Sequence, residues 1–386
     1  MRIALLCSDL GIPLGGTKGA SVHLRAVASS LLRMGHQVSA IVATAGPETG
    51  YAPVAERGLE VRVLRQPRTV REIDWHLSQL QSELVLERLS LLSPEGAIAA
   101  AEAGVPHLYE VNAPLDEEAA RHRNFDRIED ARVAFAQGFA ASRGAMAVSE
   151  EVARWVRTLA PAGFPVTVES NGAGPEFLAS PDAKLVHRIE ERLRLGGGEF
   201  RVGFVGTFRP WHDIDTLLHA ASELSKSVPT RLIMVGDGPQ RNHVLRTAWS
   251  GRAAVTLTGA VPHTEVPAHL ALCDAVAVPY ASEDVYFSPL KLVEAMAASR
   301  PVVASATGPV KRVVTDGRDG LLVAPGDRDG FTAALSRLAF EPALRGRLGA
   351  EARRTVEREY TWDAVIGRVL KFAAGLPARA EGSWRV

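Results

Sequence analysis

Residues 286–297 read Tyr-Phe-Ser-Pro-Leu-Lys-Leu-Val-Glu-Ala-Met-Ala, and they constrain the interpretation of this chain more than any other stretch. Ser288 is a favourable N-cap and Pro289 fits the first position of a helix, so the stretch predicts a helix N-terminus. The unpaired N–H groups and the positive dipole end of such a helix bind anions. Lys291 and Glu294 are three residues apart and share one helical face near that end. A cation for phosphate and a carboxylate for ribose hydroxyls would suit a nucleoside diphosphate. A capped amphipathic helix with a surface ion pair is the alternative that this stretch alone leaves open.

The composition is that of a globular protein with two domains. The chain has 386 residues, of which 46% are hydrophobic and 23% charged. Its 44 basic residues balance 44 acidic ones, which disfavours a nucleic-acid partner bound through phosphate neutralisation. Cys7 and Cys273 lie in apolar runs and predict core residues in a reducing compartment, not a disulfide or a metal site. No apolar run approaches the roughly 18 residues that a membrane span requires. The run Met1–Cys7 predicts a first strand and not a signal peptide, so we expect a cytoplasmic protein.

Short apolar runs alternate with helical patterns along the chain, which indicates parallel α/β architecture. A predicted helix at Ser21–Met34 is closed by Gly35, and a charged helix from about Lys184 to Leu195 is followed by a glycine break at residues 196–198. The strands that we expect are Arg2–Cys7, Gln37–Val42, Glu60–Leu64, Leu84–Glu87, Pro106–Glu110, Ala145–Val148, Val166–Glu169, Arg201–Val205, Arg231–Val235, Val255–Leu257, Ala275–Val278, Pro301–Ala304 and Gly320–Val323. Two α/β halves joined near residues 180–198 would face each other across a cleft, and the loops after their strands should carry the chemistry.

Glycine-containing loops follow several of the predicted strands. Residues 8–20 contain Gly16 and Gly19, where a glycine lets the backbone approach a ligand and the next helix supplies N–H groups. This loop is not a G-x-G-x-x-G fingerprint, and a flexible surface turn is its alternative interpretation. In the second half, Gly206 precedes Arg209, a permanent cation, and His212, which could be a donor or a structural residue.

A further glycine turn, Gly236-Asp237-Gly238, follows the next strand. Each of these turns alone is weak evidence, but several of them at strand ends in the same half favour a binding edge.

With these motifs in place, the chain resembles the retaining glycosyltransferases of family 4, which have the GT-B fold. The resemblance covers nearly the whole chain, and its landmarks keep their order. They are the Gly15-Gly16 loop, Val148-Ser149, Asn171-Gly172, Gly206, residues 235–239, Leu257-Thr258-Gly259, Val278-Pro279-Tyr280, residues 288–297, residues 301–305, Gly308, Asp316-Gly317 and residues 319–323.

The resemblance implies α/β architecture with two Rossmann-like domains whose parallel sheets face each other across a cleft. Residues 1–180 would form the acceptor-side domain, completed by a crossover helix at about 361–380. Residues 198–360 would form the nucleotide-sugar-binding domain. The implied activity is transfer of a hexosyl or related sugar from a nucleotide-sugar donor to an acceptor, with retention of the anomeric configuration.

The resemblance also implies roles for particular residues. Arg209 and Lys291 would stabilise the leaving phosphate, which makes a metal unnecessary, and Glu294 would bind ribose. The backbone at Ser288, Pro289 and Leu290 would face the diphosphate beside the glycine turns at Gly206, Gly236 and Gly238, with Gly16 or Gly19 approaching from the first domain. The aspartates of Asp213-Ile214-Asp215 have the spacing of a metal-binding D-x-D, but we expect them to cap and flank a helix.

Several positions depart from the family pattern. Tyr286 stands where the first acid of the family's E-x7-E motif would be, and Asn112 stands where a histidine often lies by the reacting sugar. Glu110 would be a neighbouring polar group there, with a structural role as the alternative. These departures keep a second class open, a catalytically inactive GT-B partner protein. A non-hydrolysing nucleotide-sugar epimerase is a third interpretation, disfavoured because no acid/base pair is evident in the matching loops.

The sequence leaves the acceptor undefined. It could be a small molecule, a glycan or a lipid-linked sugar, and a lipid acceptor would allow peripheral attachment at the inner membrane face. A UDP-sugar is favoured over a GDP-sugar by prevalence in the family alone, and the nucleotide sugar is a substrate, so no cofactor is expected.

Overall fold

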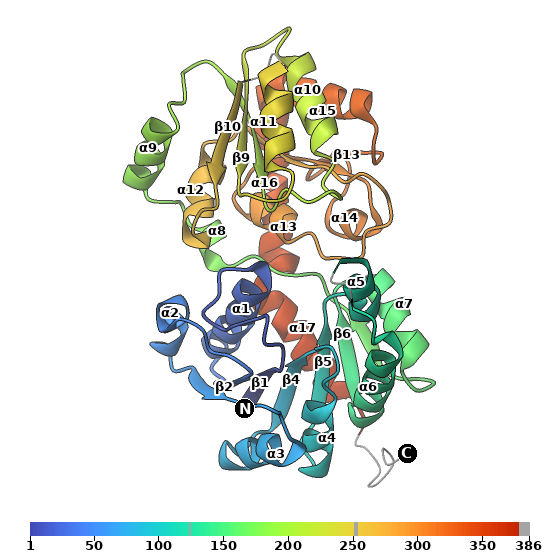
Figure 1. Ribbon diagram of the computed structural model, residues 1–386. Coiled ribbons are helices and arrows are strands. Elements are labelled where there is room, and N and C mark those ends of the chain that lie inside the picture. The colour runs from blue at the N-terminus through green and yellow to red at the C-terminus, as the bar shows by residue number, and fades with distance from the viewer. Residues whose placement is uncertain (123–124, 251–253, 378–386) are drawn as a thin grey trace. The chain divides into compact units, whose positions relative to one another are not determined.

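The computed structural model describes residues 1–122, 125–250 and 254–377. The chain divides into two compact units. Unit 1 contains Met1–Ser170, the short segment Tyr286–Ser288 and the chain from Trp362 onward, and unit 2 contains Asn171–Val285 and Pro289–Thr361. Figure 1 shows a parallel sheet with helices around it in each unit.

Unit 1 is built on a seven-stranded sheet in the order β3-β2-β1-β4-β5-β6-β7, and all its strand pairs are parallel. The strands are β1 Arg2–Cys7, β2 Gln37–Val42, β3 Glu60–Val63, β4 Leu84–Arg88, β5 His107–Val111, β6 Gly144–Ala147 and β7 Val166–Val168. Buried apolar side chains on the central strands β1, β2 and β4 pack against the helices, which is why these segments read as continuous apolar runs.

The helices of unit 1 pack in two groups: α3, α4 and α6 contact one another in sequence, and α17 packs against α1. Gly35, with φ +83°, follows the C-cap of α1 as the sequence predicts. The helices are α1 Gly19–Arg33, η1 Glu48–Gly50, α2 Ala52–Ala55, α3 Val70–Gln79, α4 Glu95–Glu102, α5 Leu115–His122, α6 Ile128–Ala141, α7 Glu150–Leu159 and α17 Trp362–Gly375. The crossover helix expected at about 361–380 corresponds to α17, and residues 378–380 of that range lie outside the described residues.

Unit 2 is built on a six-stranded sheet in the order β10-β9-β8-β11-β12-β13, again with parallel pairs throughout. The strands are β8 Phe200–Val205, β9 Thr230–Val235, β10 Ala254–Gly259, β11 Ala275–Val278, β12 Val302–Ser305 and β13 Leu321–Val323. Its largest core cluster joins the sheet to α10 and α15, which pack against each other. The helices are α8 Pro175–Leu178, α9 Ala183–Arg192, α10 Ile214–Leu224, α11 Arg241–Ser250, η2 His263–Glu265, α12 Val266–Ala271, α13 Leu290–Ala297, α14 Gly308–Val313, α15 Arg328–Phe340, α16 Pro342–Thr355 and η3 Val356–Tyr360.

These elements confirm the predicted fold class of two Rossmann-like parallel sheets. Each of the predicted strands is present, with boundaries displaced by at most two residues. Cys7 and Cys273 are both buried free thiols, as expected for core residues. None of the described helices has the length and apolarity needed to cross a membrane.

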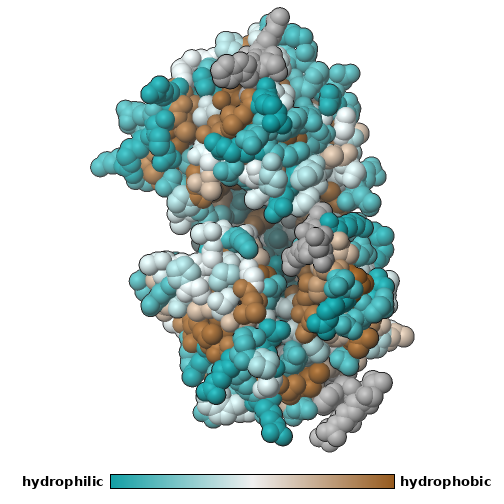
Figure 2. All heavy atoms as spheres, viewed as in Figure 1, coloured by the Kyte–Doolittle hydropathy of each residue, from teal (hydrophilic) through white to brown (hydrophobic). Residues whose placement is uncertain are grey.

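The face drawn in Figure 2 is mostly hydrophilic, with apolar residues in separate patches.

Each sheet has one place where the strand order reverses. In unit 1, β1 lies between β2 and β4, and in unit 2, β8 lies between β9 and β11. The connections on the two sides of such a point leave the strands in opposite directions, so a crevice opens at their carboxyl ends. The loops after β1 and β4, and those after β8 and β11, are therefore where ligand-binding residues are expected.

A buried polar network stabilises the centre of unit 1. The Glu87 carboxyl and the His107 ring are both almost fully buried, and Glu87 Oε2 lies 2.8 Å from His107 Nε2. The other ring nitrogen, Nδ1, lies 2.9 Å from the hydroxyl of Ser142, which also bonds to backbone groups. Burial raises the pKa of Glu87 well above its usual range and lowers that of His107 to about 3. A protonated Glu87 that donates to a neutral His107 avoids a buried charge, while Oε1 of Glu87 has no hydrogen-bond partner among the described residues.

This network predicts a pH-dependent stability difference. The folded-state pKa of Glu87 lies above its unfolded value of about 4.3, so the stability that its proton provides is present below that pH and is lost as the pH rises toward the folded pKa. Glu87→Gln keeps an N–H donor for His107 and does not titrate. We expect the free energy of unfolding of the variant, relative to that of the wild type, to increase by up to about 1.4 kcal/mol for each pH unit in that window. Urea unfolding at several pH values measures this difference. Glu102→Gln, at an exposed position on α4, is the matched control, and a pH-independent difference for Glu87→Gln contradicts the assignment.

Candidate functional site

Two glycine turns lie against each other at the carboxyl ends of β8 and β9. Gly206 and Gly236 have φ values of +139° and +128°, which favour glycine, and a Cβ on Gly236 would lie only 2.1 Å from the carbonyl oxygen of Gly206. A Cβ on Gly238 would meet the backbone nitrogen of Phe208 at 2.4 Å. The backbones can approach this closely only because these residues lack side chains. The turns predicted separately from the sequence thus form one surface beside the reversal point of unit 2.

The side chain of Lys291 ends beside this surface. Its Cδ and Nζ lie 3.7 and 3.8 Å from the position that a Cβ on Gly206 would occupy. The nitrogen is enclosed, and none of the described residues forms a hydrogen bond with it. It lies 4.7 Å from the ring centroid of Phe204 and 5.3 Å from that of Tyr280. Burial holds the pKa of Lys291 well below its usual range. An ammonium in this position has aromatic faces around it but no counter-ion, so an anionic ligand would supply what the protein lacks.

His212 shares the aromatic surroundings of Lys291. Its ring packs against Phe204 and Tyr280, and Nδ1 lies 2.6 Å from the carbonyl oxygen of Thr207. That carbonyl can only accept, so Nδ1 carries the proton and Nε2 is an acceptor in the neutral ring. Burial, with smaller effects from Lys291 and Arg209, lowers the pKa of His212 to about 3.

Arg209 lies in the same loop with an exposed side chain. Its guanidinium carbon is 5.6 Å from the ring centroid of Trp211. The cation is therefore available at the surface of the loop, and its assignment to the phosphate remains a prediction.

The start of α13 differs from the sequence prediction. The N-cap is Pro289, with φ −81° and ψ 66°, and Leu290 is the first helical residue, so the assignment of Ser288 as N-cap and Pro289 as first residue is wrong by one position. The Ser288 hydroxyl does not cap α13 but lies 2.9 Å from that of Ser170, within unit 1. Helix α13 still presents its N-terminus, and hence Leu290 and Lys291, at the end of the loop that follows β11.

Glu294 is buried on the next turn of α13. Its Oε1 lies 2.8 Å from Nε2 of His263, in the loop after β10. Burial raises the pKa of Glu294, and the contact with His263 partly offsets that rise. Glu294 is the residue that the family resemblance assigns to ribose, whereas its partner His263 was not predicted from the sequence.

The aspartates of the D-x-D stretch have structural contacts. Asp213 caps α10 by accepting a bond from the backbone N–H of Thr216 at 3.1 Å, as expected from the sequence. Asp215 Oδ1 lies 2.6 Å from Nε2 of His243. Neither residue needs a metal to account for its position.

In unit 1, the loop after β1 leads into α1. Gly19 is the first residue of α1, with open space around it, while a Cβ on Gly16 would lie 2.6 Å from the Ser21 hydroxyl. Gly19 therefore has room beside it that Gly16 lacks.

A cluster of charged groups lies at the reversal point of unit 1. Glu110, on β5, has Oε1 2.7 Å from Nε2 of His23 and 3.1 Å from the guanidinium of Arg88, and it accepts a short bond from the amide of Asn112. Burial alone would raise the pKa of Glu110, but His23, Arg88 and Asn112 together hold it at about 2. A carboxylate with so low a pKa is a poor proton acceptor, so Glu110 fits the expected role of a neighbouring polar group that orients Asn112 and Arg88.

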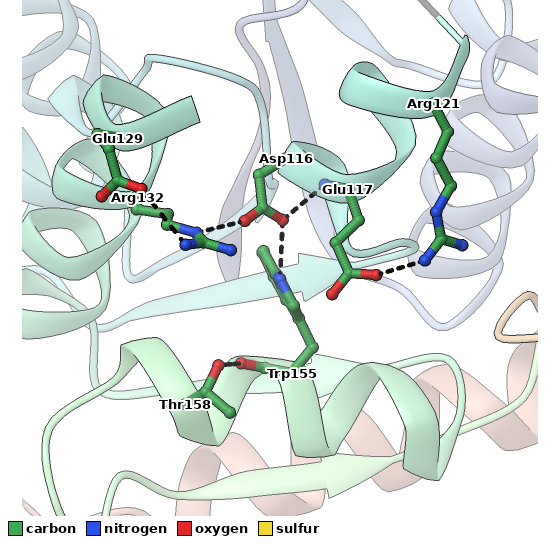
Figure 3. Close-up of polar contacts among 7 residues, drawn as sticks. All are labelled: Asp116, Glu117, Arg121, Glu129, Arg132, Trp155 and Thr158. Atoms are coloured by element: carbon green, nitrogen blue, oxygen red, sulfur yellow. Dashed lines mark hydrogen bonds and ion pairs between the residues drawn. The ribbon is translucent and has the colours of Figure 1, made fainter. Parts of the chain in front are cut away.

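The helix that follows Asn112 is anchored by a buried carboxylate. Asp116, in the first turn of α5, accepts bonds from Trp155 Nε1 at 2.9 Å and from Arg132 Nε at 2.8 Å, as Figure 3 shows. These donors lie on α7 and α6, so one side chain joins three helices. Tyr286 belongs to the same unit and donates to Glu118 of α5 at 3.2 Å. Tyr286, which stands where the first acid of the E-x7-E motif would be, thus has a structural contact within unit 1.

The structure brings some of the predicted residues together and separates others. Gly206, Gly236, Gly238 and Lys291 form one region of unit 2, while Glu110 and Asn112 form one region of unit 1. Sequence reasoning missed the contacts of His23 and His263. A histidine directly after a predicted strand-end loop, as in Gly259-Ala260-Val261-Pro262-His263, was the available signal for His263.

Comparison with known proteins agrees with this architecture. Residues 199–340, which include β8 to β13, match the family described as glycosyl transferases group 1. This part of the chain is therefore similar to the group 1 glycosyltransferases. The family resemblance stated from the motifs is thereby confirmed.

Individual relatives define how far the likeness extends. The chain is 32% identical over 206 residues to a GDP-mannose-dependent alpha-(1-6)-phosphatidylinositol monomannoside mannosyltransferase of Mycolicibacterium smegmatis, a match that covers 52% of this chain and 53% of the relative. The chain thus spans about half the length of that relative. A protein of the same description from Mycobacterium tuberculosis is 27% identical to this chain, in a match that covers 83% of this chain and 85% of the relative. The crystal structure of Anabaena HepE in complex with UDP shares the fold, with a TM-score of 0.74, 18% identity and coverage of 97% of this chain and 100% of that chain.

The Lys291 assignment predicts opposite effects on stability and on anion binding. Lys291→Met removes an enclosed, unpartnered nitrogen, so we expect the free energy of unfolding at neutral pH to rise by about 1–3 kcal/mol in urea titrations. The folded-state pKa of Lys291 lies below the unfolded value of about 10.4, so the wild type gains stability as the pH rises between these two values. The difference in free energy of unfolding between Lys291→Met and the wild type therefore becomes smaller as the pH rises. Inorganic diphosphate should bind the wild type and not the variant. The exposed Lys184→Met on α9 is the control, and a loss of stability in Lys291→Met would falsify the view of an uncompensated cation.

The Glu110 cluster predicts a stabilisation of the fold that is lost at low pH. The folded-state pKa of about 2 lies below the unfolded value, so the stabilisation is present above about pH 4 and is lost as the pH falls toward 2. Glu110→Gln leaves Arg88 and His23 without their carboxylate, so we expect a loss of about 3 kcal/mol at neutral pH that shrinks on acidification. Urea unfolding followed from neutral to acid pH measures it, and a loss that is constant with pH contradicts the ion-pair assignment.

Proposed function

We propose that this protein transfers a hexosyl or related sugar from a nucleoside-diphosphate sugar to an acceptor, with retention of the anomeric configuration. The observation that carries the proposal is the enclosed side-chain nitrogen of Lys291, which lies beside the glycine turns of unit 2 and has no hydrogen-bond partner in the described part of the chain. It lies on the first turn of α13, and helix N-termini attract anions. A diphosphate would satisfy the nitrogen, the helix end and the exposed Arg209 together.

The catalytic contribution of these groups is electrostatic. When the bond from the sugar to the diphosphate breaks, negative charge develops on the leaving oxygen, and groups held in place before the reaction stabilise it. Lys291 is held between Phe204 and Tyr280, so little reorganisation accompanies that stabilisation. The space where a side chain on Gly206 would lie is bordered by Lys291 and leaves room for a phosphate oxygen, while Gly236 and Gly238 let the turns pack against each other. Because Lys291 and Arg209 supply positive charge, the proposed reaction needs no metal.

The remaining roles follow from the family resemblance. Glu294 binds the ribose, and the backbone at Ser288, Pro289 and Leu290 contacts the diphosphate. In unit 1, Asn112 contacts the reacting sugar, Glu110 orients Asn112, and Gly16 or Gly19 contributes backbone. Gly19 is favoured of the two because nothing lies within 4 Å of its Cβ position.

For the nucleotide base of the donor and for the acceptor, we propose chemical classes and not single compounds. The mannosyltransferase relatives are described as GDP-mannose-dependent, and the HepE structure contains UDP. A UDP-sugar remains our first expectation from prevalence in the family, with GDP-mannose as the alternative that these relatives add. A polyol, glycan or lipid-linked sugar would serve as acceptor.

A donor panel tests the function directly. We expect UDP or GDP to raise the melting temperature in a thermal shift screen that also contains ADP and TDP. The matching sugar nucleotides should then be hydrolysed or transferred, with the rate unchanged by EDTA, and NMR of the product should show the donor's anomeric configuration. Nucleotide binding without donor consumption would favour the inactive partner protein, and interconversion of sugar nucleotides without acceptor would favour the epimerase.

Two variants separate binding from chemistry. Glu294→Ala should weaken nucleotide binding about tenfold, as expected for one lost hydrogen-bonding group. Lys291→Ala should mainly lower kcat because its charge is used most in the transition state. The proposal of this site fails if both variants retain wild-type Kd and kcat, and the exposed Lys184→Ala serves as the control.

A further inference from the structure

His263 connects a solvent-facing loop of unit 2 to the buried Glu294. It is the first residue of η2, and its side chain is 31% exposed, whereas the side chain of Glu294 is 8% exposed. The two side chains meet through His263 Nε2 and Glu294 Oε1 at 2.8 Å. One of the two carboxylate oxygens is therefore engaged by the protein at the edge of the enclosed region.

The His263 ring is held on a second side. The ring of Phe177, on α8 and almost fully buried, packs edge-on against it with centroids 5.2 Å apart and an interplanar angle of 61°. Three separate segments, α8, η2 and α13, thus define the position of the Glu294 carboxylate. Such a constraint is more than a solvent-exposed ion pair needs, because mobile side chains satisfy each other without it.

The charge around the pair explains why Glu294 needs this partner. Burial disfavours the ionised carboxylate, Glu176 on α8 adds like charge, and the contact with His263 acts in the opposite direction. Glu265, on the same turn as His263, forms an ion pair with Arg192, with 3.5 Å between the carboxylate oxygen and the guanidinium nitrogen. The side-chain nitrogen of Lys291 on α13 instead lies at the rings of Phe204 and Tyr280. Among these charged groups, His263 is therefore the one that favours an acceptor oxygen on Glu294.

We propose that His263 is a positioning residue for nucleotide recognition: it engages one oxygen of Glu294 and so presents the other to the ribose hydroxyls. This inference rests on the proposed function, because it requires a nucleoside diphosphate at α13. An ionised carboxylate accepts up to four hydrogen bonds, so a bond from His263 to Oε1 leaves capacity for a vicinal diol. Without His263, Glu294 can take a proton or rotate, and hydroxyl recognition is lost.

The test compares ligands that differ only in the ribose. Binding of UDP, GDP and their 2′,3′-dideoxy counterparts is measured by calorimetry for the wild type, His263→Ala and His263→Gln. We expect the wild type to prefer the ribonucleotide, and His263→Ala to reduce that preference about tenfold through weaker ribonucleotide binding with dideoxynucleotide binding unchanged. His263→Gln retains a donor and should recover part of the preference. In the Glu294→Ala background, His263→Ala should have no further effect on the preference.

The controls separate a positioning role from a structural one. His187→Ala, an exposed histidine on α9 with a side chain 69% exposed, should bind all four ligands like the wild type. If His263→Ala weakens ribonucleotides and dideoxynucleotides equally, His263 only maintains the fold and the inference is overturned while the proposed function stands. A wild type without preference for the ribonucleotide also overturns it. A wild type that binds neither UDP nor GDP refutes the proposed function itself.

Discussion

Parallel strand pairing is the constraint on which the rest of this structure depends. In a parallel sheet every strand runs in the same direction, so all carboxyl ends, and all the loops that follow them, meet at one edge. Each connection must return along the sheet through a helix, and the order reverses at β1 in one unit and at β8 in the other. The glycine turns, the helix starts and the charged residues of both units lie along these edges as a consequence. Residues far apart in sequence, such as Gly206 and Lys291, become neighbours for this reason.

Three buried ionisable groups show different ways of meeting the cost of desolvation. Glu110 keeps its charge because His23, Arg88 and Asn112 lie at its Oε1 and favour the ionised carboxylate. Glu87 gives up its charge and donates a hydrogen bond to His107, which keeps this buried pair neutral. The nitrogen of Lys291 faces aromatic rings, it has no hydrogen-bond partner among the described residues, and burial lowers its pKa. A group left uncompensated in this way marks a place where a ligand completes the structure.

The sequence predicted the strands well and the polar contacts poorly, for physical reasons. Buried parallel strands are short continuous apolar runs, so β1, β2 and β11 are recognised at their observed boundaries from local composition. The helix at residues 290–297 was found but placed one residue early, because Ser288 has a competing partner in Ser170 that is distant in sequence. The lysine and glutamate of α13 were singled out by spacing alone. Their partners could not be, since Phe204, Tyr280 and His263 come from other strands and loops.

Local sequence patterns by themselves determined the α/β class, the two sheets, the resemblance to the glycosyltransferases and the helix that carries Lys291 and Glu294. These follow from periodicity, from turn residues and from motifs in a fixed order, all of which are properties of neighbouring residues. Only the tertiary structure decided that Lys291 is enclosed without a hydrogen-bond partner among the described residues, that Glu294 is paired with His263, and that Glu110 lies beside His23 and Arg88. Burial and charge pairing depend on atoms brought together across the sheet, and a linear pattern does not contain those distances.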